Sequence, residues 1–339
     1  MSDYEFTAAQ AVLREGYYVM SRQASIESRS TTWPEQLAVR IARYYYVLGL
    51  TQMEIADIVG ISRTRVIRLL ADARQRGVVS IRINSPLLEN EELAEALVTK
   101  FGLKAADVCL SHASDEYQLA HQIGAASGDI IRRHIHDSMS VGLGWGITLK
   151  EFVDQFDILP CKDVSVVSLL GSLTRRSSVT RFEATTELAA RLDAECLYLP
   201  APIVCDSAAT RGLLTEQPLF QDIFNRALKT DLAIVSIGGL DSATIRLVDL
   251  ISDEEFNSVR AKGAIGNFLG YYIDEQGELV DHPINDRIIG IQGNEFMRIP
   301  RRFMLSAGES KVRALRAVLS QGYCTDLVTD QKTARALLK

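Results

Sequence analysis

Several features of secreted and membrane proteins are missing from this chain of 339 residues. Its five cysteines form no Cys-x-x-Cys pair, and so sparse and odd a set argues against a disulfide framework and for reduced, mostly buried thiols. No apolar run approaches the ~20 residues that a membrane-spanning helix needs. The first residues, MSDYEFTAAQ, lack the basic and apolar segments of a signal peptide. We therefore expect a cytoplasmic protein that does not associate with a membrane.

Motifs of common enzyme and metal sites are missing as well. The sequence contains neither a Walker loop nor a Gly-x-Ser-x-Gly elbow. His134 and His136 are too close on a helix to share one face, and no cysteine or acid stands at ligand spacing from them. These absences lead us to expect no metal, no cofactor and no catalytic residues, and hence a protein that is not an enzyme.

The whole chain is acidic, with a net charge of −6, but one segment is basic and contains no lysine. Between residues 35 and 85, eight arginines and four acidic residues give a net charge of +4, which leaves −10 for the remainder. The apolar fraction of 47% is that of a globular protein. A basic module attached to an acidic body predicts that only one part of the protein meets an anionic polymer.

The pattern of apolar residues and chain breakers divides the sequence into four parts. The length fits two domains. Short β-branched runs alternate with helical segments in the last part, which predicts an α/β domain with parallel strands and crossover helices on both faces. The parts are an extension (1–33), a basic helical domain (34–85), an amphipathic connector helix (86–104) and the α/β domain (105–339).

The basic domain contains the pattern of a helix-turn-helix, in the text LTQMEIADIVGISRTRVIRLLADARQRGVVSIRI from residue 50 to 83. Thr51 and Glu54 fit a capping box, Gly60 suits the tight turn between two helices, and Ser62 fits the N-cap of the second helix. The closing residues VVSIRI predict a strand suited to a small wing. The alternative is an arbitrary helical hairpin whose arginine face is merely solvated.

A second helix of this kind lies in the major groove of DNA with its first residues at the base edges. Arg63, Thr64 and Arg68 are therefore our candidates for base or near-base contacts, and Arg65 for the backbone. Thr51, Gln52 and Arg82 are candidates for contacts to phosphates, and Ser62, at the start of the second helix, completes the set of DNA-contact candidates. One module this small binds weakly, so we expect a dimer or tetramer on repeated half-sites.

A glycine-rich loop, VGLGWGITL at residues 141–149, joins an expected strand to an expected helix. A dinucleotide fingerprint would need a third glycine where Ile147 or Leu149 stands, which argues against NAD. Free backbone amides at a helix N-terminus instead suit an anion. Thr148 adds a hydroxyl and Trp145 a flat apolar wall against which a sugar ring can pack. The alternative is a tight turn with a core tryptophan.

From about residue 35 to 339, a series of short motifs makes the sequence resemble the SorC family of bacterial sugar-binding transcriptional regulators, also called DeoR-like. No motif is decisive alone, but their order and spacing are specific. They are Leu50-Thr51-Gln52, Glu54-Ile55-Ala56, Ser62-Arg63, Gly144-Trp145-Gly146-Ile147-Thr148, Gly171, Leu199-Pro200-Ala201-Pro202, Gly263-Ala264-Ile265-Gly266, Asp274, Gly277, Ala307-Gly308-Glu309-Ser310-Lys311, Leu327-Val328-Thr329-Asp330 and Thr333-Ala334.

The resemblance implies a Rossmann-like effector domain, similar to sugar-phosphate isomerases, that binds a sugar, polyol or sugar phosphate without converting it. It places the phosphate at Gly144, Trp145, Gly146, Ile147 and Thr148, and the sugar near Gly171, Ser172 and Lys311. Arg181 and Glu183 stand where many members carry a short asparagine-type motif, and Asn267 where many carry aspartate. Asp274 either faces the pocket or forms a hairpin turn.

These observations predict a DNA-binding regulator whose affinity for double-stranded operator DNA is controlled by a small carbohydrate. The motivating feature is the basic helix-turn-helix joined to an acidic α/β body. The alternative is a sugar-phosphate isomerase or transferase that carries a DNA-binding arm, but no convincing acid–base pair is evident in the sequence.

Overall fold

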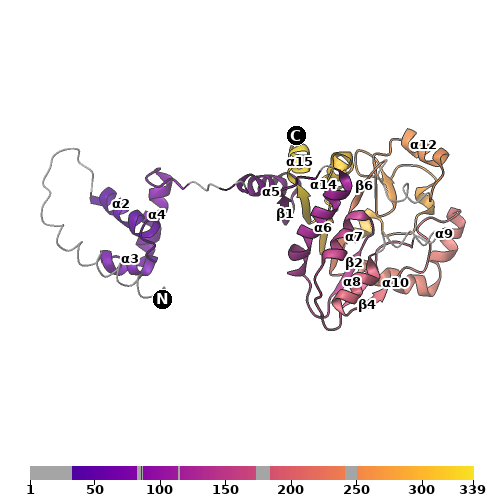
Figure 1. Ribbon diagram of the computed structural model, residues 1–339, viewed down its shortest axis with the longest axis horizontal. Helices are drawn as coiled ribbons and strands as arrows, with labels where there is room; N and C mark the ends of the chain where they lie inside the picture. Colours follow the sequence, from indigo (N-terminus) through magenta and orange to yellow (C-terminus); the bar gives the residue numbers. More distant parts are fainter. Residues whose placement is uncertain (1–32, 82–84, 86, 114, 173–183, 241–249) are drawn as a thin grey trace. The chain divides into compact units, whose positions relative to one another are not determined.

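The computed structural model describes residues 33–81, 85, 87–113, 115–172, 184–240 and 250–339 (Figure 1). The chain divides into two compact units, residues 1–83 and residues 84–339. The candidate site residues Arg82, Arg181 and Glu183 lie outside the described ranges. Within those ranges, none of the helices combines the length and the apolar character that crossing a bilayer requires.

The described part of the first unit consists of three helices around a small apolar core. The helices are α2 (Trp33–Tyr46), α3 (Gln52–Val59) and α4 (Arg63–Gln75). Each contributes one side chain with no exposed surface, namely Ile41, Ile55 and Val66. Because α3 and α4 each bury one stripe, their other faces remain in solvent.

Local capping interactions fix the ends of α3 and α4 as the sequence predicts. The Thr51 amide donates to the Glu54 carboxylate at 2.8 Å, and the Glu54 amide donates to the Thr51 hydroxyl at 3.3 Å, which completes a capping box. Gly60 has a φ of 71°, the left-handed conformation that ends α3. The Ser62 hydroxyl accepts from the Arg65 amide and so caps α4.

The prediction of a wing strand is wrong for the described residues 78–81, which form turn and coil. Gly77 adopts a φ of 72° just after α4, and the Val79 amide turns back to donate to the Ala73 carbonyl at 3.2 Å. This hydrogen bond closes the helix C-terminus, so the Val79 amide is unavailable for a strand ladder. Val79 packs against the three-helix core instead.

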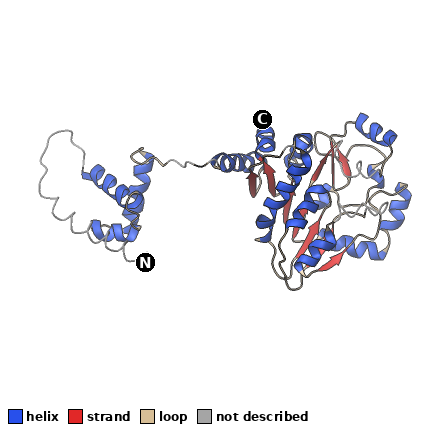
Figure 2. Cartoon of the chain, viewed as in Figure 1, coloured by secondary structure: helices blue, strands red, loops and turns tan. Residues whose placement is uncertain are grey.

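A seven-stranded sheet forms the centre of the second unit (Figure 2). All six neighbouring pairs are parallel, in the order β1-β10-β9-β5-β2-β3-β4, which confirms the predicted parallel α/β sheet. The strands are β1 (Ala105–Cys109), β2 (Ser140–Leu143), β3 (Ser165–Ser168), β4 (Glu195–Leu197), β5 (Leu232–Val235), β9 (Arg301–Leu305) and β10 (Asp326–Asp330).

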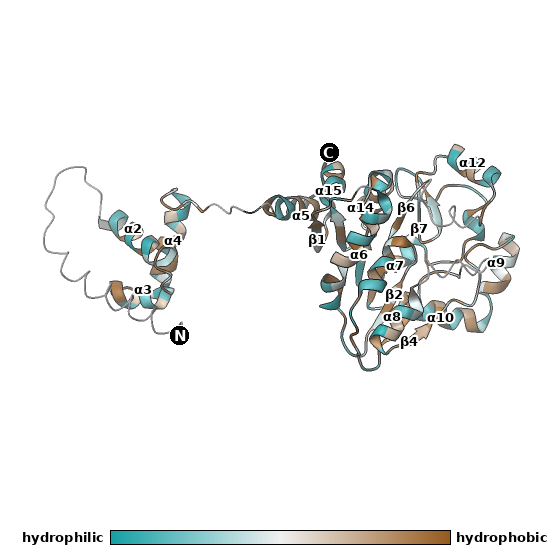
Figure 3. Ribbon diagram, viewed as in Figure 1, coloured by the Kyte–Doolittle hydropathy of each residue, from teal (hydrophilic) through white to brown (hydrophobic). Residues whose placement is uncertain are grey.

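Helices cover both faces of this sheet, because successive side chains of each strand enter two different apolar clusters. On β5, for example, Ile234 packs in one cluster with α6, α7 and α8, whereas Val235 packs in the other with α5, α10, α14 and α15. The helices are α5 (Leu88–Phe101), α6 (Glu116–Arg132), α7 (Ile147–Gln155), α8 (Thr185–Leu192), α9 (Ala208–Thr215), α10 (Pro218–Leu228), α12 (Asp253–Ala261), α13 (Gly293–Phe296), α14 (Val312–Ser320) and α15 (Gln331–Leu338). Hydrophilic and hydrophobic residues alternate along them (Figure 3), as expected of helices with one buried face.

A small antiparallel sheet adjoins the second of these clusters. It consists of β6 (Ile237–Gly239), β7 (Gly266–Phe268) and β8 (Tyr271–Ile273), with β7 in the centre. Short 3-10 turns, η3 (Asn285–Arg287) and η4 (Glu309–Lys311), follow later in the chain. The run RIIGIQ at 287–292 reads as a strand in the sequence but makes only isolated bridges, from Ile288 and Gly290.

Close contact between α6 and α7 predicts a large difference between two glycines of α6. A Cβ on Gly124 would lie 2.6 Å from the backbone of Glu151 and Phe152, whereas the nearest atom to one on Gly128 is 3.9 Å away. Gly124→Ala should therefore lower the free energy of unfolding by about 1–3 kcal/mol. Gly128→Ala is the matched control and should be neutral or raise it by about 0.4–1 kcal/mol. Urea unfolding measures both, and equal effects would contradict this packing.

Candidate functional site

A cavity lies where the strand order of the large sheet reverses. The chain continues from β2 to β3 and β4 on one side, and from β5 to β9 and β10 on the other. In open parallel sheets, ligands bind outside the carboxyl ends of the strands at such a switch point. Here residues 144–148, from the end of β2 into α7, and residues 235–238, from the end of β5 into β6, line a cavity of about 60 Å³ together with Lys311 and Asn267.

The glycine loop brings backbone amides to one wall of this cavity. The Gly144 amide donates to the Ile234 carbonyl at 2.9 Å, which fixes the loop to β5. Gly146 has a φ of 143°, which side chains rarely tolerate, and the described residues provide no side-chain cap for α7. The Lys150 amide is bonded to the Gly146 carbonyl. The amides of the preceding turn are thus left to a ligand, and the helix dipole favours an anion there.

Lys311 provides a positive charge at the same cavity. Gly308, with a φ of 118°, precedes it, and the Gly308 amide donates to the buried Thr333 hydroxyl at 2.9 Å. The half-buried Lys311 ammonium makes no hydrogen bond or ion pair with any residue that the structure describes. Burial lowers its pKa below the usual lysine range, and the Glu116 carboxylate opposes part of that shift. An anionic ligand would compensate this unpaired charge.

The remaining wall is apolar with a few polar groups. The indole nitrogen of Trp145 is buried and, within the described ranges, has no hydrogen-bond partner. The Asn267 amide donates to the Gly270 carbonyl at 2.7 Å, while Leu170 and Leu269 supply apolar surface. The cavity volume of about 60 Å³ exceeds the space that one water molecule needs.

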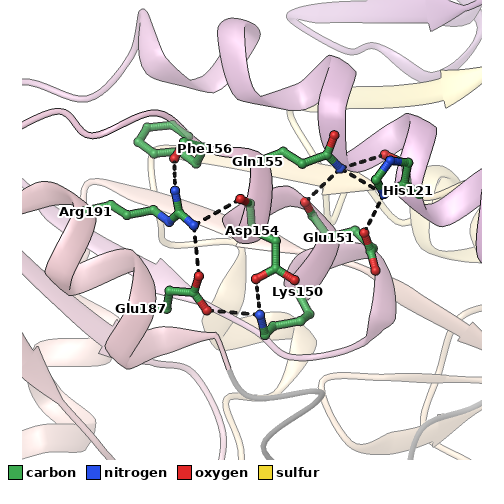
Figure 4. Close-up of polar contacts among 8 residues, drawn as sticks. All are labelled: His121, Lys150, Glu151, Asp154, Gln155, Phe156, Glu187 and Arg191. Carbon is green, nitrogen blue, oxygen red and sulfur yellow. Dashed lines mark hydrogen bonds and ion pairs between the residues drawn. The ribbon is translucent and has the colours of Figure 1, made fainter.

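A polar network on α6, α7 and α8 fixes the helix that carries the glycine loop (Figure 4). Lys150 binds Glu187 at 3.0 Å and also Asp154, and Arg191 binds the same Glu187 at 2.9 Å. Burial alone would raise the pKa of Glu187, but hydrogen bonds from Arg191 and Lys150 lower it below its usual value. Lys150 is therefore engaged in structure, and Lys311 is the lysine available to a ligand in the cavity.

A second pair of contacts joins α6 to α7. His121 lies 2.7 Å from the Glu151 carboxylate, measured from Nδ1 to Oε2, and the Gln155 amide donates to the His121 and Glu151 carbonyls (Figure 4). These bonds lie on the same side of α7 as the close approach of Gly124. The helix that presents the glycine loop is thus held on two sides, which preorganises its N-terminal amides.

The structure brings six of the predicted effector residues to one cavity: Gly144, Trp145, Gly146, Ile147, Thr148 and Lys311. Three others lie elsewhere. Gly171 packs against Pro202, where a Cβ would be 2.7 Å from the Pro202 backbone. Ser172 lines a separate cavity of about 690 Å³, and the Asp274 carboxylate accepts from the Gln276 and Glu278 amides in a turn.

Sequence reasoning missed the lining residues contributed by the loop after β5. Ser236 and Gly238 reach the cavity because β5 is the neighbour of β2, although about 90 residues separate them in the chain. The run DLAIVSIG shows a strand followed by small residues, but it does not show which strand lies beside it. Asn267, noted only as a departure from the family pattern, also lines the cavity.

The exposed face of α4 carries the predicted DNA-contact residues. Arg63, Thr64, Arg65 and Arg68 are all exposed. The Arg63 Nε donates to the Gln52 Oε1 at 3.3 Å, so the first residue of α3 orients the first arginine of α4. The side chains of Thr51 and Ser62 are engaged in capping. Within the described ranges, no group of acids, histidines and cysteines is arranged to hold a metal ion.

Comparisons with known proteins agree with this architecture. A family model for a sugar-binding domain matches residues 85–339. The deoxyribonucleoside regulator of Bacillus subtilis (strain 168) is 29% identical over 310 residues, which are 90% of this chain and 97% of the relative. The transcriptional regulator LsrR of Escherichia coli (strain SMS-3-5 / SECEC) is 30% identical over 327 residues, 94% of this chain and 100% of the relative.

A solved structure extends the likeness to both units. The full-length sorbitol operon regulator SorC from Klebsiella pneumoniae matches with a TM-score of 0.68 and 28% identity, over 90% of this chain and 99% of that one. The match to this full-length regulator covers a larger share of the chain than the second unit alone contains. The chain belongs to the SorC family of sugar-binding transcriptional regulators, whose members bind DNA under the control of a sugar effector.

Proposed function

We propose that the effector is a small phosphorylated sugar or polyol, bound with its phosphate in the cavity between β2 and β5. The observation that supports this is the meeting of uncapped helix amides and the unpaired Lys311 ammonium in one cavity. Backbone amides at a helix N-terminus and a lysine are the groups that recognise phosphate. The carbohydrate part would extend along Trp145, whose flat ring suits a sugar face and whose N–H needs an acceptor.

The names of related proteins point to sugars, polyols and their derivatives. They include regulators of deoxyribonucleosides, of erythritol catabolism and of a sorbitol operon. All three names refer to small polyhydroxylated molecules or their derivatives. The chemistry of the cavity adds the expectation of a phosphate to that class.

We further propose that residues 34–85 form the DNA-binding domain, with α3 and α4 as a helix-turn-helix, and that residues 105–339 form the effector domain. Arg63, Thr64 and Arg68 would contact base edges, with Arg63 held by Gln52, and Arg65 would contact the backbone. Two copies would place two α4 helices in successive major grooves, so the acting form is a homo-oligomer. Because its proposed partner is operator DNA, the protein would act in the cytoplasm.

A thermal-shift screen against sugars, polyols and their phosphates tests the effector proposal. We expect one phosphorylated compound to raise the midpoint of unfolding, and its unphosphorylated form to do so far less, because ligands that bind only the folded state stabilise it. Fluorescence anisotropy with operator DNA tests the proposal of DNA binding. We expect an affinity that falls steeply as the salt concentration rises. Stabilisation by neutral sugars alone, or salt-insensitive DNA binding, would contradict the proposal.

The lowered pKa of Lys311 predicts a specific pH dependence of effector affinity. As pH rises through that pKa, Lys311 loses its proton and its attraction for phosphate, so affinity falls; below about pH 6 the phosphate itself becomes a monoanion and affinity falls again. Isothermal titration across this range should give an optimum between the two limbs. In Lys311→Met only the alkaline limb should disappear, and an unchanged alkaline limb would exclude Lys311 as its source.

A series of hydrogen bonds connects the segment before Lys311 to α15, and α15 to α5. The Gly308 amide binds Thr333 on α15, Arg335 on α15 binds Glu89 on α5 at 2.8 Å, and the Lys100 ammonium donates to the Leu337 carbonyl at 2.8 Å. Helix α5 is the first helix after the DNA-binding unit in sequence. We propose that effector binding acts on the DNA-binding unit through α15 and α5.

Thr333→Val tests this route, because it removes the hydroxyl and keeps the shape of the side chain. We expect effector affinity to change less than threefold and protein stability to fall by about 1–3 kcal/mol, since a buried amide loses its partner. The ratio of operator affinities with and without effector should move toward one. A ratio equal to that of the natural protein would show that this hydrogen bond carries no coupling.

A further inference from the structure

The DNA-facing side of α4 has arginines at its margins and apolar groups in its middle. Side chains on a helix turn by about 100° per residue. On the exposed side of α4, this places Ile67, Ala71 and the methyl-bearing Thr64 between Arg63 at one margin and Arg68 at the other, with Arg74 and Gln75 on the same side at the C-terminal end of the helix. Ile67 is 43% exposed. The middle of the face is therefore apolar, although the unit as a whole is strongly basic.

Ile67 is not part of the apolar core of the described helices. The α4 residues that pack in the three-helix core are Val66, Leu69, Leu70 and Ala73, which lie on the opposite side. In a helix, isoleucine is also intrinsically less favourable than alanine. Because Ile67 is 43% exposed and lies outside this core, its replacement by alanine tests the exposed surface rather than the core.

We propose that Ile67 reads the 5-methyl group of a thymine in each operator half-site, and that it thereby determines specificity at that base pair. This inference rests on the proposed placement of α4 in the major groove. There the thymine methyl is the apolar group among the base edges, while guanine offers the acceptors that suit arginine. A face with Arg63 and Arg68 at its margins and Ile67 between them, nearer to Arg63, thus fits a thymine adjacent to the bases or phosphates that these arginines contact.

Deoxyuridine substitution isolates the methyl group, because it removes that group and leaves every hydrogen-bonding atom of thymine in place. The probe is a duplex selected from a random-sequence pool with the full-length protein, then synthesised with each thymine changed singly to deoxyuridine. We expect one position per half-site to lose about fourfold in affinity for the natural protein, as for one methyl group left unburied. Ile67→Ala should bind the parent duplex about fourfold more weakly and be indifferent to deoxyuridine at that position.

Ile58→Ala is the matched control, since Ile58 is an equally exposed isoleucine (48%) on α3. It should retain the full deoxyuridine effect. If Ile67→Ala keeps that effect, or no thymine methyl matters, the inference is overturned while sequence-specific binding by α4 stands. If Ile67→Ala instead lowers the oligomeric state in light scattering and Ile58→Ala does not, Ile67 faces a partner chain and the inference is again overturned. Failure to select any sequence from the pool would refute the proposed function of α4 itself, and the inference with it.

Discussion

Replacing Lys311 with methionine should weaken sugar-phosphate binding by about 100-fold, the largest effect that we expect of any single change in the effector domain. The substitution keeps the length of the side chain but removes the charge that the described residues leave unpaired. A charge-assisted hydrogen bond to a phosphate in a confined cavity is worth about 1.5–3 kcal/mol, and 2.8 kcal/mol corresponds to 100-fold. Isothermal titration with the phosphorylated effector measures this loss directly.

Two comparisons separate this effect from a general disturbance. Lys332→Met alters an exposed lysine at the start of α15 and should leave the affinity unchanged. The dephosphorylated effector should bind the natural protein and Lys311→Met with similar, weak affinities, because no phosphate is present to distinguish them. A loss smaller than threefold in Lys311→Met would show that the phosphate lies elsewhere.

Replacing both Arg63 and Arg68 with alanine should reduce affinity for the operator by at least about 30-fold. Each well-placed arginine contact to guanine contributes about 1–3 kcal/mol of discrimination, and two are removed. Both side chains are exposed, so the free energy of unfolding should change little. Effector affinity should be unaffected, because the cavity is lined by residues of the other unit. Anisotropy titrations with the operator and with an unrelated duplex measure the loss of affinity and of specificity.

Arg76→Ala is the control for charge alone. Arg76 follows α4, is exposed and pairs with Asp72 at 2.9 Å. Its removal lowers the positive charge of the unit by one without touching the DNA-facing side, so only a small and sequence-independent loss should follow. If the double variant loses, for each charge removed, no more operator affinity than Arg76→Ala loses, α4 does not read the DNA sequence.

The features that the sequence predicted correctly are governed by local interactions. The capping box of Thr51 and Glu54 depends on residues three apart, and the turn at Gly60 depends on one backbone conformation. Similarly, alternating strands and helices fix a parallel α/β sheet without knowledge of strand order. Such interactions can be read from short stretches of sequence because every partner is nearby in the chain.

The features that the sequence missed depend on long-range neighbours or on competition between local structures. Ser236 reaches the cavity because β5 lies beside β2, which strand composition does not reveal. Val78 and Val79 have the composition of a strand, but the helix C-terminus after Gly77 takes the Val79 amide. The sequence is compatible with two roles for Asp274, in the pocket or in a turn, and the structure shows its carboxylate accepting hydrogen bonds from two backbone amides of a turn.

The central claim is that one molecule connects carbohydrate binding in the cavity to DNA binding by α4. Titrating the phosphorylated effector into a preformed complex of the full-length protein and its operator, followed by anisotropy, tests it most directly. We predict that operator affinity changes at least fivefold at saturation, that the midpoint lies between the effector's dissociation constants for the free and the DNA-bound protein, and that Lys311→Met shows no change at the same concentrations. Operator affinity that stays constant while the effector saturates the natural protein would contradict the account.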